Sequence, residues 1–461
     1  MGARHAGSRA LVLGASMAGL CAARVLAERF DAVGVLERDP LPQALLPRRG
    51  TPQVRHAHAL LVAGAERLEG WFPGLAAELR ADGALPLDRS RQIHWYQAGG
   101  LRRAPRPGGE DLGALCSRLL LEHHVRRRVS ALPSVTLRQG VAEGLLPAAS
   151  GRAVCGVRLE TGEEIPADLV VDATGRSACT VRWLETLGFE PPPRSEVRID
   201  MGYATRILRP HPAGGPDWLI GVVVGEPPAA RLGVAFALEG PRWMVTLAGF
   251  HGDHAPTDPD GWLAFARSLP DPAIAELVAA CEPLTEVVTH RMRASQRRHV
   301  ERLQDVAGGI VLLGDAVASF NPIYGQGMTS AALQAEALGV ALDRCHELGP
   351  RFVRRYNRLA ARVVETPWRM SVGADFALPQ TSGPRPRGSA LVGRYLGSAI
   401  RAAQHDAVVS RRLVDVGQLV RPPRALLAPA VALRVARAAW RRRREGSNGA
   451  AGRCREERSP V

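Results

Sequence analysis

A glycine-containing turn near the beginning of the chain restricts its fold more than any other feature of the sequence. Residues 8–14 form a short, mainly apolar run that ends at Gly14, and helix-forming residues follow at 17–29. The turn from Gly14 to Gly19 reads Gly-Ala-Ser-Met-Ala-Gly, a GxGxxG pattern with Ser16 in place of the middle glycine. A strand, a tight turn and a helix in this order begin a βαβ unit. We therefore expect an α/β fold built on a parallel sheet.

The same turn predicts a dinucleotide-binding site. Gly14 can form the turn, the small Ser16 lets a pyrophosphate approach the backbone, and Gly19 lets the helix pack closely on the sheet. The beginning of the helix offers unpaired N–H groups and the positive end of its dipole to phosphates. A second apolar run at 32–36 ends at Glu37, where a carboxylate can bind ribose hydroxyls. Small residues can also serve a plain turn, and this alternative stays open for the motif alone.

A second glycine-rich segment, late in the chain, favours FAD over NAD. The apolar run 309–313 predicts a buried strand, and a helix is expected to begin near Gly327. Asp315 at the strand end can accept hydrogen bonds from ribitol hydroxyls, while backbone N–H groups and a helix dipole can face the negative charge of a reduced flavin. The alternative is a glycine-rich turn with a solvated Asp315. The candidate residues of this segment are Gly314, Asp315, Pro322, Gly325, Gly327 and Met328.

Four separated segments, in family order, resemble the group A FAD-dependent monooxygenases: 12–19, 36–39, 172–176 and 314–328. Other segments are similar to the bacterial polyether epoxidases, relatives of squalene epoxidase: 50–58, 203–206 and 319–325. The resemblance spans roughly residues 9–335 and implies noncovalent FAD with NAD(P)H as a transient reductant. It also implies a monooxygenase that uses O2, through a flavin hydroperoxide, to epoxidise or hydroxylate an apolar natural product of polyene, polyketide or terpenoid type.

The resemblance also implies which residues contact the cofactor. It assigns the first glycine turn to the pyrophosphate and Glu37 to the adenosine ribose. It assigns Arg118 to the flavin side, Asp315 to the pyrophosphate and ribitol, and the turn at 325–328 to the isoalloxazine edge. The fingerprint at 172–176 lies, in relatives, near the pyrophosphate and the path of the reductant. The cofactor-binding residues expected in this way are Gly14, Ser16, Gly19, Glu37, Arg38, Arg118, Asp172, Gly175, Gly314, Asp315, Pro322, Gly325, Gly327 and Met328.

No catalytic side chain and no metal ligand is predicted. A simple alkene has no proton to remove, and the nearest polar candidates, His251, Asp253 and His254, are expected in a solvent-exposed loop. His56 and His58 can line the flavin pocket or bind backbone groups. A metal site is not expected there, because a third ligand with metal-binding spacing is missing. The fingerprint at 172–176 reads Asp-Ala-Thr-Gly-Arg instead of the Asp-Gly form of phenol hydroxylases, which leaves the choice between NADH and NADPH open.

Other functions compete with the epoxidase or hydroxylase interpretation. They are an FAD-dependent reductase or dehydrogenase of a prenyl-like alkene, an aromatic hydroxylase, and a flavin- or nucleic-acid-binding protein without catalysis. A flavin halogenase is disfavoured, because that family uses a lysine and a Trp-x-Trp-x-Ile-Pro segment, and the chain contains neither.

The charge of the chain is concentrated near its end. The chain has no lysine, so all 60 basic residues are arginines, and the net charge is +15. Residues 421–461 hold eleven arginines and three glutamates, a net charge of +8. A nucleic-acid site is not expected, since aromatic residues are only 5% of the chain. The basic amphipathic segment 426–444 can instead contact an anionic membrane, with a solvated helix as the alternative.

The remaining composition fits a cytoplasmic protein of several domains. The seven cysteines are scattered and lack metal-binding spacing, so free thiols are expected. No run approaches the ~20 apolar residues that span a bilayer. We expect a discontinuous FAD-binding Rossmann domain, an inserted β-rich substrate domain, a helical C-terminal region and a basic disordered tail. Their expected bounds are 1–190 plus 296–345, 191–295, 346–440 and 441–461.

Overall fold

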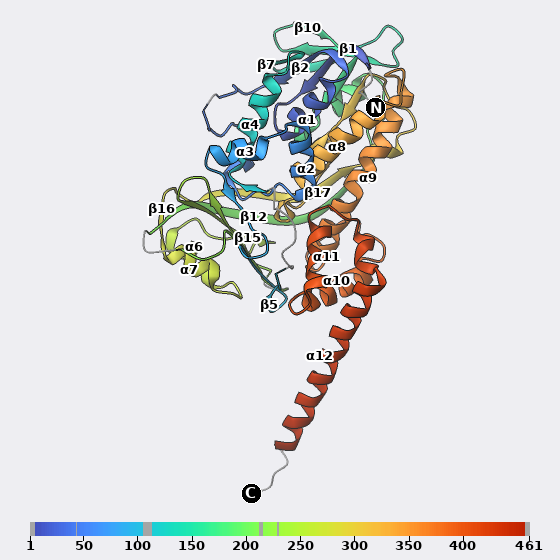
Figure 1. Cartoon of the computed structure of the whole chain (residues 1–461). Helices are drawn as coiled ribbons and strands as arrows, with labels where there is room; N and C mark the ends of the chain where they lie inside the picture. Colours follow the sequence, from blue (N-terminus) through green and yellow to red (C-terminus); the bar gives the residue numbers. More distant parts are fainter. Residues whose placement is uncertain (1–4, 43, 105–112, 212–214, 228–229, 457–461) are drawn as a thin grey trace.

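The computed structural model describes residues 5–42, 44–104, 113–211, 215–227 and 230–456, with side chains described as far as residue 442. An α/β part carries both glycine turns, a β-rich part lies beside it, and a group of helices follows, from which the last helix, α12, projects (Figure 1). The predicted α/β fold is confirmed.

A parallel sheet of five strands forms the centre of the α/β part. Its strands lie in the order β18-β11-β1-β2-β7, and every neighbouring pair is parallel. The late strand β18 pairs with β11, so a segment from far along the chain completes the sheet that the first residues begin. The bounds are β1 Gly7–Leu13, β2 Phe30–Glu37, β7 Val135–Gln139, β11 Leu169–Asp172 and β18 Ile310–Leu312.

Both faces of this sheet are covered. Along β1, Ala10 and Val12 pack in a core with helices that include α1, α4, α8 and α9, whereas Leu11 and Leu13 pack with the small antiparallel sheet β8-β9-β10. The alternation follows from the two-residue period of a strand, and burial on both faces explains the continuous apolar sequence. The bounds are α1 Met17–Leu26, α4 Arg118–Ser130, α8 Gly327–Leu342, α9 Pro350–Asp375, β8 Ala142–Pro147, β9 Val154–Leu159 and β10 Glu164–Pro166. Shorter elements nearby are α2 Val62–Trp71, α3 Leu75–Ala81, α5 Cys179–Thr186, β3 Leu85–Pro86 and β6 Ala114–Leu115.

The β-rich part is a second, larger sheet. Its order is β19-β17-β12-β15-β14-β13-β4-β5, with β16 paired to β12. The helices α6 and α7 cover one face through Trp262, Phe265 and Ile274, and α9 covers the other through Trp368 and Val372. The bounds are β4 Ile93–Gln97, β5 Gly100–Leu101, β12 Arg194–Pro210, β13 Ile220–Val224, β14 Leu232–Leu238, β15 Arg242–Phe250, β16 Cys281–Pro283, β17 Val288–Arg298, β19 Ala318–Ser319, α6 Pro259–Arg267 and α7 Ala273–Ala279.

The second sheet includes strands from outside the bounds expected for the inserted domain. Strands β4 and β5, inside the segment 1–190, belong to the second sheet, because β4 pairs in parallel with β13. At the other bound, β17 continues to Arg298 and β19 pairs with it. The second sheet therefore draws strands from both sides of the segment 191–295.

The C-terminal region is helical, as its sequence predicts. Helices α10 and α11 pack with the beginning of α12 around Ala402, Val409, Val431 and Val435. Helix α12 continues to Glu456, so the segment expected to be a disordered tail from residue 441 begins within a helix, and 457–461 lie outside the described residues. The bounds are α10 Ser389–Ala403, α11 Ala407–Gly417 and α12 Pro429–Glu456.

Candidate dinucleotide site

The first glycine turn needs both of its glycines. Gly14 has a φ of +100°, and a Cβ there would lie 2.7 Å from the carbonyl oxygen of Ala173. A Cβ at Gly19 would lie 1.8 Å from the carbonyl oxygen of Gly14. Neither position can hold a side chain without moving the backbone. The turn thus brings the beginning of α1 directly onto the end of β1.

The second glycine segment meets the first one. Gly314, after β18, has a φ of +70°, and a Cβ there would lie 2.8 Å from the Cβ of Ala18 in the first turn of α1. The Gly314 amide donates a hydrogen bond to Gln334 of α8 (2.9 Å). Two turns that the sequence separates by most of the chain therefore form one site.

Asp315 lies at this junction. Its side chain is exposed although its neighbours Gly314 and Ala316 are buried. Solvent reaches the carboxylate. The surrounding protein nevertheless removes part of its hydration, which raises its pKa, while the guanidinium groups of Arg118 and Arg176 lower it. An exposed carboxylate beside two cations can accept hydrogen bonds from ligand hydroxyls.

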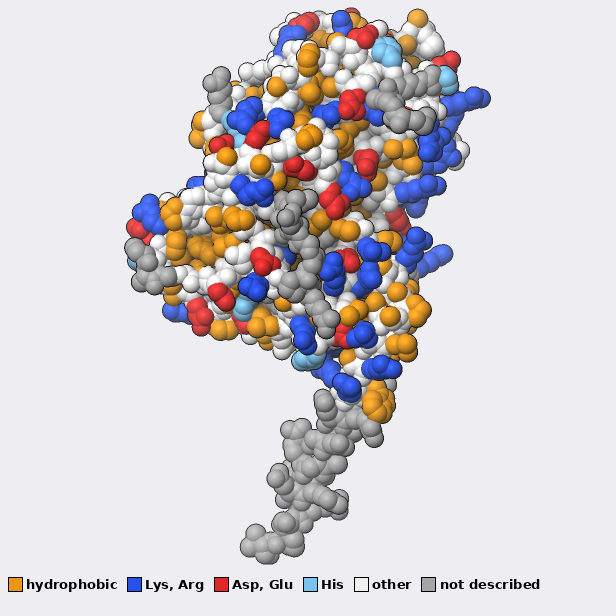
Figure 2. Space-filling model, viewed as in Figure 1, with side chains coloured by type: hydrophobic (Ala, Val, Ile, Leu, Met, Phe, Trp, Pro, Cys, Tyr) orange, Lys and Arg blue, Asp and Glu red, His pale blue; other side chains and the backbone are white. Residues whose placement is uncertain are grey.

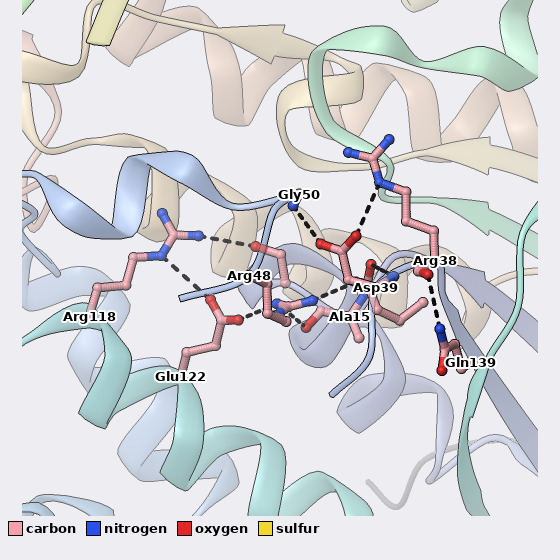
Figure 3. A network of polar contacts seen from close by, with 10 residues as sticks. Ala15, Arg38, Asp39, Arg48, Gly50, Arg118, Glu122 and Gln139 are labelled. Carbon is pink, nitrogen blue, oxygen red and sulfur yellow. Dashed lines mark hydrogen bonds and ion pairs between the residues drawn. The ribbon is translucent and has the colours of Figure 1, made fainter. Parts of the chain in front are cut away.

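Arg118 crosses the site from the first turn of α4. Its guanidinium donates to the Ser16 hydroxyl (3.1 Å) and to Nε2 of His58 (3.1 Å). Its Nε lies 3.5 Å from a carboxylate oxygen of Glu122, and Figure 3 shows this ion pair. Burial and then Arg118 lower the pKa of His58 to about 3, so His58 is neutral, and its Nδ1 donates to the His56 carbonyl (2.8 Å). Arg118 therefore stands beside the beginning of α1 as a fixed cation.

Glu37 ends β2 beside the turn, as the sequence predicts, and its carboxylate already has partners. One oxygen accepts from the Ala15 amide (2.9 Å) and lies 2.8 Å from Arg48, and the other accepts from the Asp39 amide (3.1 Å). Arg48 also contacts Glu122 (Figure 3). Sequence reasoning missed Arg48, whose only signal was its place in an Arg- and Pro-rich loop. Arg38, by contrast, is exposed and lies 4.0 Å from Asp39.

Asp172 has a structural role in this arrangement. It is fully buried, and one carboxylate oxygen accepts from the amide (2.8 Å) and hydroxyl (2.6 Å) of Thr174. The other oxygen accepts from the Thr180 hydroxyl. The carboxylate thus orders the turn that leads to Gly175, whose φ is +77°. A direct contact of Asp172 or Gly175 with a cofactor stays a prediction.

The turn expected at the isoalloxazine edge lies between β19 and α8. Pro322 begins a short 3-10 helix, η5 (Pro322–Tyr324), and Gly325 follows with a φ of +64°. A Cβ at Gly325 would lie 2.8 Å from the Cβ of Ala59, so this turn packs against the loop before α2. Gly327, which begins α8, is exposed and Met328 is buried. At Gly325 and Gly327 the turn therefore presents backbone.

The remaining polar candidates have local partners. Asp253 forms an ion pair with Arg231 (2.7 Å), and Nε2 of His254 lies 2.9 Å from the carbonyl oxygen of Asp200. His251 lies 3.3 Å from the Thr381 hydroxyl. Over the described ranges, no group of three His, Cys, Asp or Glu side chains could hold a metal ion.

These residues fit a dinucleotide. Ser16 occupies the N-cap of α1, but its side chain caps none of the described amides of the helix and binds Arg118 instead. An anion placed here would meet the helix dipole and a buried guanidinium. The glycines leave no Cβ at the closest approach.

Comparison with known proteins settles the family. No protein-family model matches the chain. Over 419 residues, the chain is 35% identical to Protein Rv3254 of Mycobacterium tuberculosis, and the match covers 87% of each protein. The chain belongs to the family of Protein Rv3254. Among the described residues, this member of the Rv3254 family has no helix with the length and apolar character needed to cross a bilayer.

Comparison with solved structures shows that the chain has a known fold. The chain resembles PqsL of Pseudomonas aeruginosa, described as a probable FAD-dependent monooxygenase, at 18% identity and a TM-score of 0.60 over 80% of this chain and 97% of PqsL. It also resembles a flavoprotein/dehydrogenase of Cytophaga hutchinsonii at 15% identity and a TM-score of 0.66, over 95% of this chain and all of that one. At such identities the likeness is one of fold.

Proposed function

We propose that this chain is an FAD-dependent monooxygenase that uses NAD(P)H and O2 to introduce one oxygen atom into an apolar organic substrate. The contact between Gly314 and Ala18 carries the proposal, because it joins both glycine turns into one site. The fold that the chain shares with a probable FAD-dependent monooxygenase and with a flavoprotein supports it.

Different residues would bind different parts of FAD. The beginning of α1 and the Arg118 guanidinium would bind the pyrophosphate, and Asp315 would accept hydrogen bonds from the ribitol. Glu37 would bind the adenosine ribose, and the turn at Gly325, whose φ is +64°, would face the isoalloxazine edge. Bound FAD would accept electrons from NAD(P)H and activate O2, while the protein orients it and excludes water.

The substrate side is apolar. A hydrophobic cluster between the second sheet and α9 extends, through Ile323 of η5, to the turn proposed for the isoalloxazine edge. Partly buried side chains pack against this cluster, as expected for the lining of a site that binds apolar molecules. They include Trp95, Ile220, Val224, Phe236, Phe250 and Phe376.

Oxygen isotope labelling tests the reaction. With NAD(P)H and a panel of apolar alkenes and arenes, the purified holoenzyme should consume O2 in step with product, and labelled O2 should add one labelled oxygen atom to that product. Epoxide or alcohol products then distinguish epoxidation from hydroxylation. Product formed without O2 consumption would replace the proposal with a reductase or dehydrogenase.

We also propose that α12 makes peripheral contact with an anionic membrane. The helix projects from the molecule (Figure 1), and Leu433 and Trp440 are each 57% exposed. Arginine side chains gather around its base (Figure 2), and Arg441 and Arg442 extend along it. A basic helix with exposed apolar side chains has the chemistry for anionic headgroups.

A further inference from the structure

A buried carboxylate at the end of α9 has an unsatisfied oxygen. Asp375, the last residue of α9, is 3% exposed. Its Oδ1 accepts a hydrogen bond from the side-chain amide of Asn321 (2.7 Å). Its Oδ2 is buried and has no hydrogen-bond partner among the described residues. One acceptor of this carboxylate is therefore left for another molecule.

A buried phenol with the complementary need lies near it. Tyr203 of β12 is 8% exposed, and its hydroxyl, too, lacks a hydrogen-bond partner within the described part of the chain. Burial, and next the Asp375 carboxylate, raise the pKa of Tyr203 and of Tyr324 well above the ordinary value. Asp375 thus lies within electrostatic reach of phenols from β12 and η5, without a hydrogen bond to either.

These groups lie where the proposed substrate would lie. Asn321 directly precedes η5, and its Oδ1 accepts from the Ile323 amide (3.2 Å), so Asp375 is tied to the turn proposed for the flavin. Tyr203 belongs to the apolar cluster that also contains Phe320 and Trp368. A donor and an acceptor without partners in an apolar wall destabilise the protein unless a ligand completes them.

The donor and the acceptor together define the missing group. A phenol donates and a carboxylate accepts, so a single atom that satisfies both must accept one hydrogen bond and donate another. A hydroxyl oxygen does this, whereas an ether or carbonyl oxygen only accepts. We propose that Tyr203 and Asp375 bind a hydroxyl group of the substrate, which makes the substrate an apolar alcohol, phenol or enol. This proposal deepens the proposed function and rests on it.

Protonation supports the assignment. Burial raises the pKa of Asp375 to about 7, and the hydrogen bond from Asn321 lowers it. Near neutral pH, a sizeable fraction of the carboxylate is ionised and accepts the stronger, charge-assisted hydrogen bond.

Paired ligands that differ only in the hydroxyl test the proposal. We would titrate the FAD-loaded protein with 2-naphthol and with 2-methoxynaphthalene by isothermal titration calorimetry, at about pH 8, where the naphthol is neutral and most of Asp375 is ionised. The wild-type protein should bind the naphthol about tenfold more tightly than the ether. Equal affinities, or no binding of the naphthol, would overturn the proposal, because water would then be the hydrogen-bond partner of both Tyr203 and Asp375.

Two substitutions locate the effect. Asp375→Asn should reduce the preference to less than about threefold, because it removes the charged acceptor that only the naphthol hydroxyl can use. Tyr203→Phe should weaken the binding of both ligands, because the ether oxygen and the hydroxyl oxygen both accept from the phenol. Tyr203→Phe removes a hydroxyl that has no partner in the described structure, so folding should persist. Tyr395→Phe is the matched control. The Tyr395 hydroxyl donates to the Leu426 carbonyl (2.6 Å), so its removal should leave the preference intact.

An Asp375→Asn protein that folds and keeps the full preference, or a Tyr203→Phe protein that folds and binds both ligands as tightly as the wild type, would contradict the role of that residue. FAD content and NAD(P)H oxidation, measured on the same wild-type samples, test the proposed function separately. A naphthol preference in a protein that does not oxidise NAD(P)H would contradict the proposed function and not the hydroxyl site.

Discussion

Gly314 packs against Ala18 so closely that a Cβ at Gly314 would lie 2.8 Å from the Ala18 Cβ. The contact joins the end of β18 to the first turn of α1. Because both segments carry dinucleotide-binding features, the contact explains why the second glycine segment must return to the first sheet. It also makes the site sensitive to a single methyl group.

Gly314→Ala should weaken FAD binding at least tenfold. The substitution strains a residue with a φ of +70° by about 1–2 kcal/mol and pushes on Ala18, which displaces the turn that would hold the pyrophosphate. Gly151→Ala is the control, because Gly151 has a φ of +66° and no atom of the described residues lies within 4 Å of its added Cβ. A flavin titration should show a loss for Gly314→Ala alone. Equal affinities in both variants would contradict the joined site.

Asp315 and Glu37 should separate cofactor binding from stability. Asp315→Ala removes an exposed carboxylate and should weaken FAD binding by ~1.5–3 kcal/mol, roughly ten- to a hundredfold. Glu37→Ala leaves the buried Arg48 with one partner fewer and should lower the thermal midpoint more than Asp315→Ala does. Flavin titration and thermal unfolding of both variants measure this. A larger loss of FAD affinity in Glu37→Ala would reverse the assignment.

Asp375 should make stability depend on pH. Its pKa is about 7 in the folded protein and roughly 3.9 when unfolded, so the folded state retains a proton that the unfolded state has lost between these values. The groups around it are the Tyr203 and Tyr324 phenols and the Asn321 amide. The stability of the wild type relative to Asp375→Asn should therefore fall by a few kcal/mol as pH rises from about 4 to about 7. Denaturant unfolding of both proteins would show a constant difference if Asp375 has an ordinary pKa.

Removal of residues 441–461 should weaken binding to anionic vesicles and leave FAD content intact. The segment holds seven arginines and three glutamates, a net charge of +4. A longer truncation that begins at residue 421 would also remove Val431 and Val435, which pack with α10 and α11. Sedimentation with phosphatidylserine vesicles measures the effect, with zwitterionic vesicles as the control. Unchanged sedimentation would exclude the membrane contact.

The sequence predicted the parts of the fold that local patterns determine. The run to Gly14, the turn and α1 follow from neighbouring residues, and the apolar run at 309–313 revealed β18 because buried parallel strands are apolar throughout. The pairing of β4 with β13 joins short segments that are far apart in the chain, and no period marks such a contact. The place of β4 and β5 in the second sheet therefore came only from the structure.

The candidate site was predictable to the same extent. The glycines have a recognisable spacing, and each of them except Gly327 has a conformation or contact that disfavours a side chain. Arg48 and Asp375 have no motif, because their roles come from burial and from partners distant in the sequence, Glu37 and Glu122 for the first and Asn321 for the second. Sequence reasoning therefore found the two glycine turns and missed the buried charges of Arg48 and Asp375, which no motif marks.

The absorption spectrum of the purified protein under exclusion of oxygen tests the central claim most directly. The protein should carry one FAD per chain that acid precipitation releases in full, since the binding is noncovalent. Addition of NADH or NADPH without oxygen should bleach the flavin absorption, and admission of O2 should restore it. A protein that binds no FAD, or a bound flavin that neither nucleotide bleaches, would contradict the account.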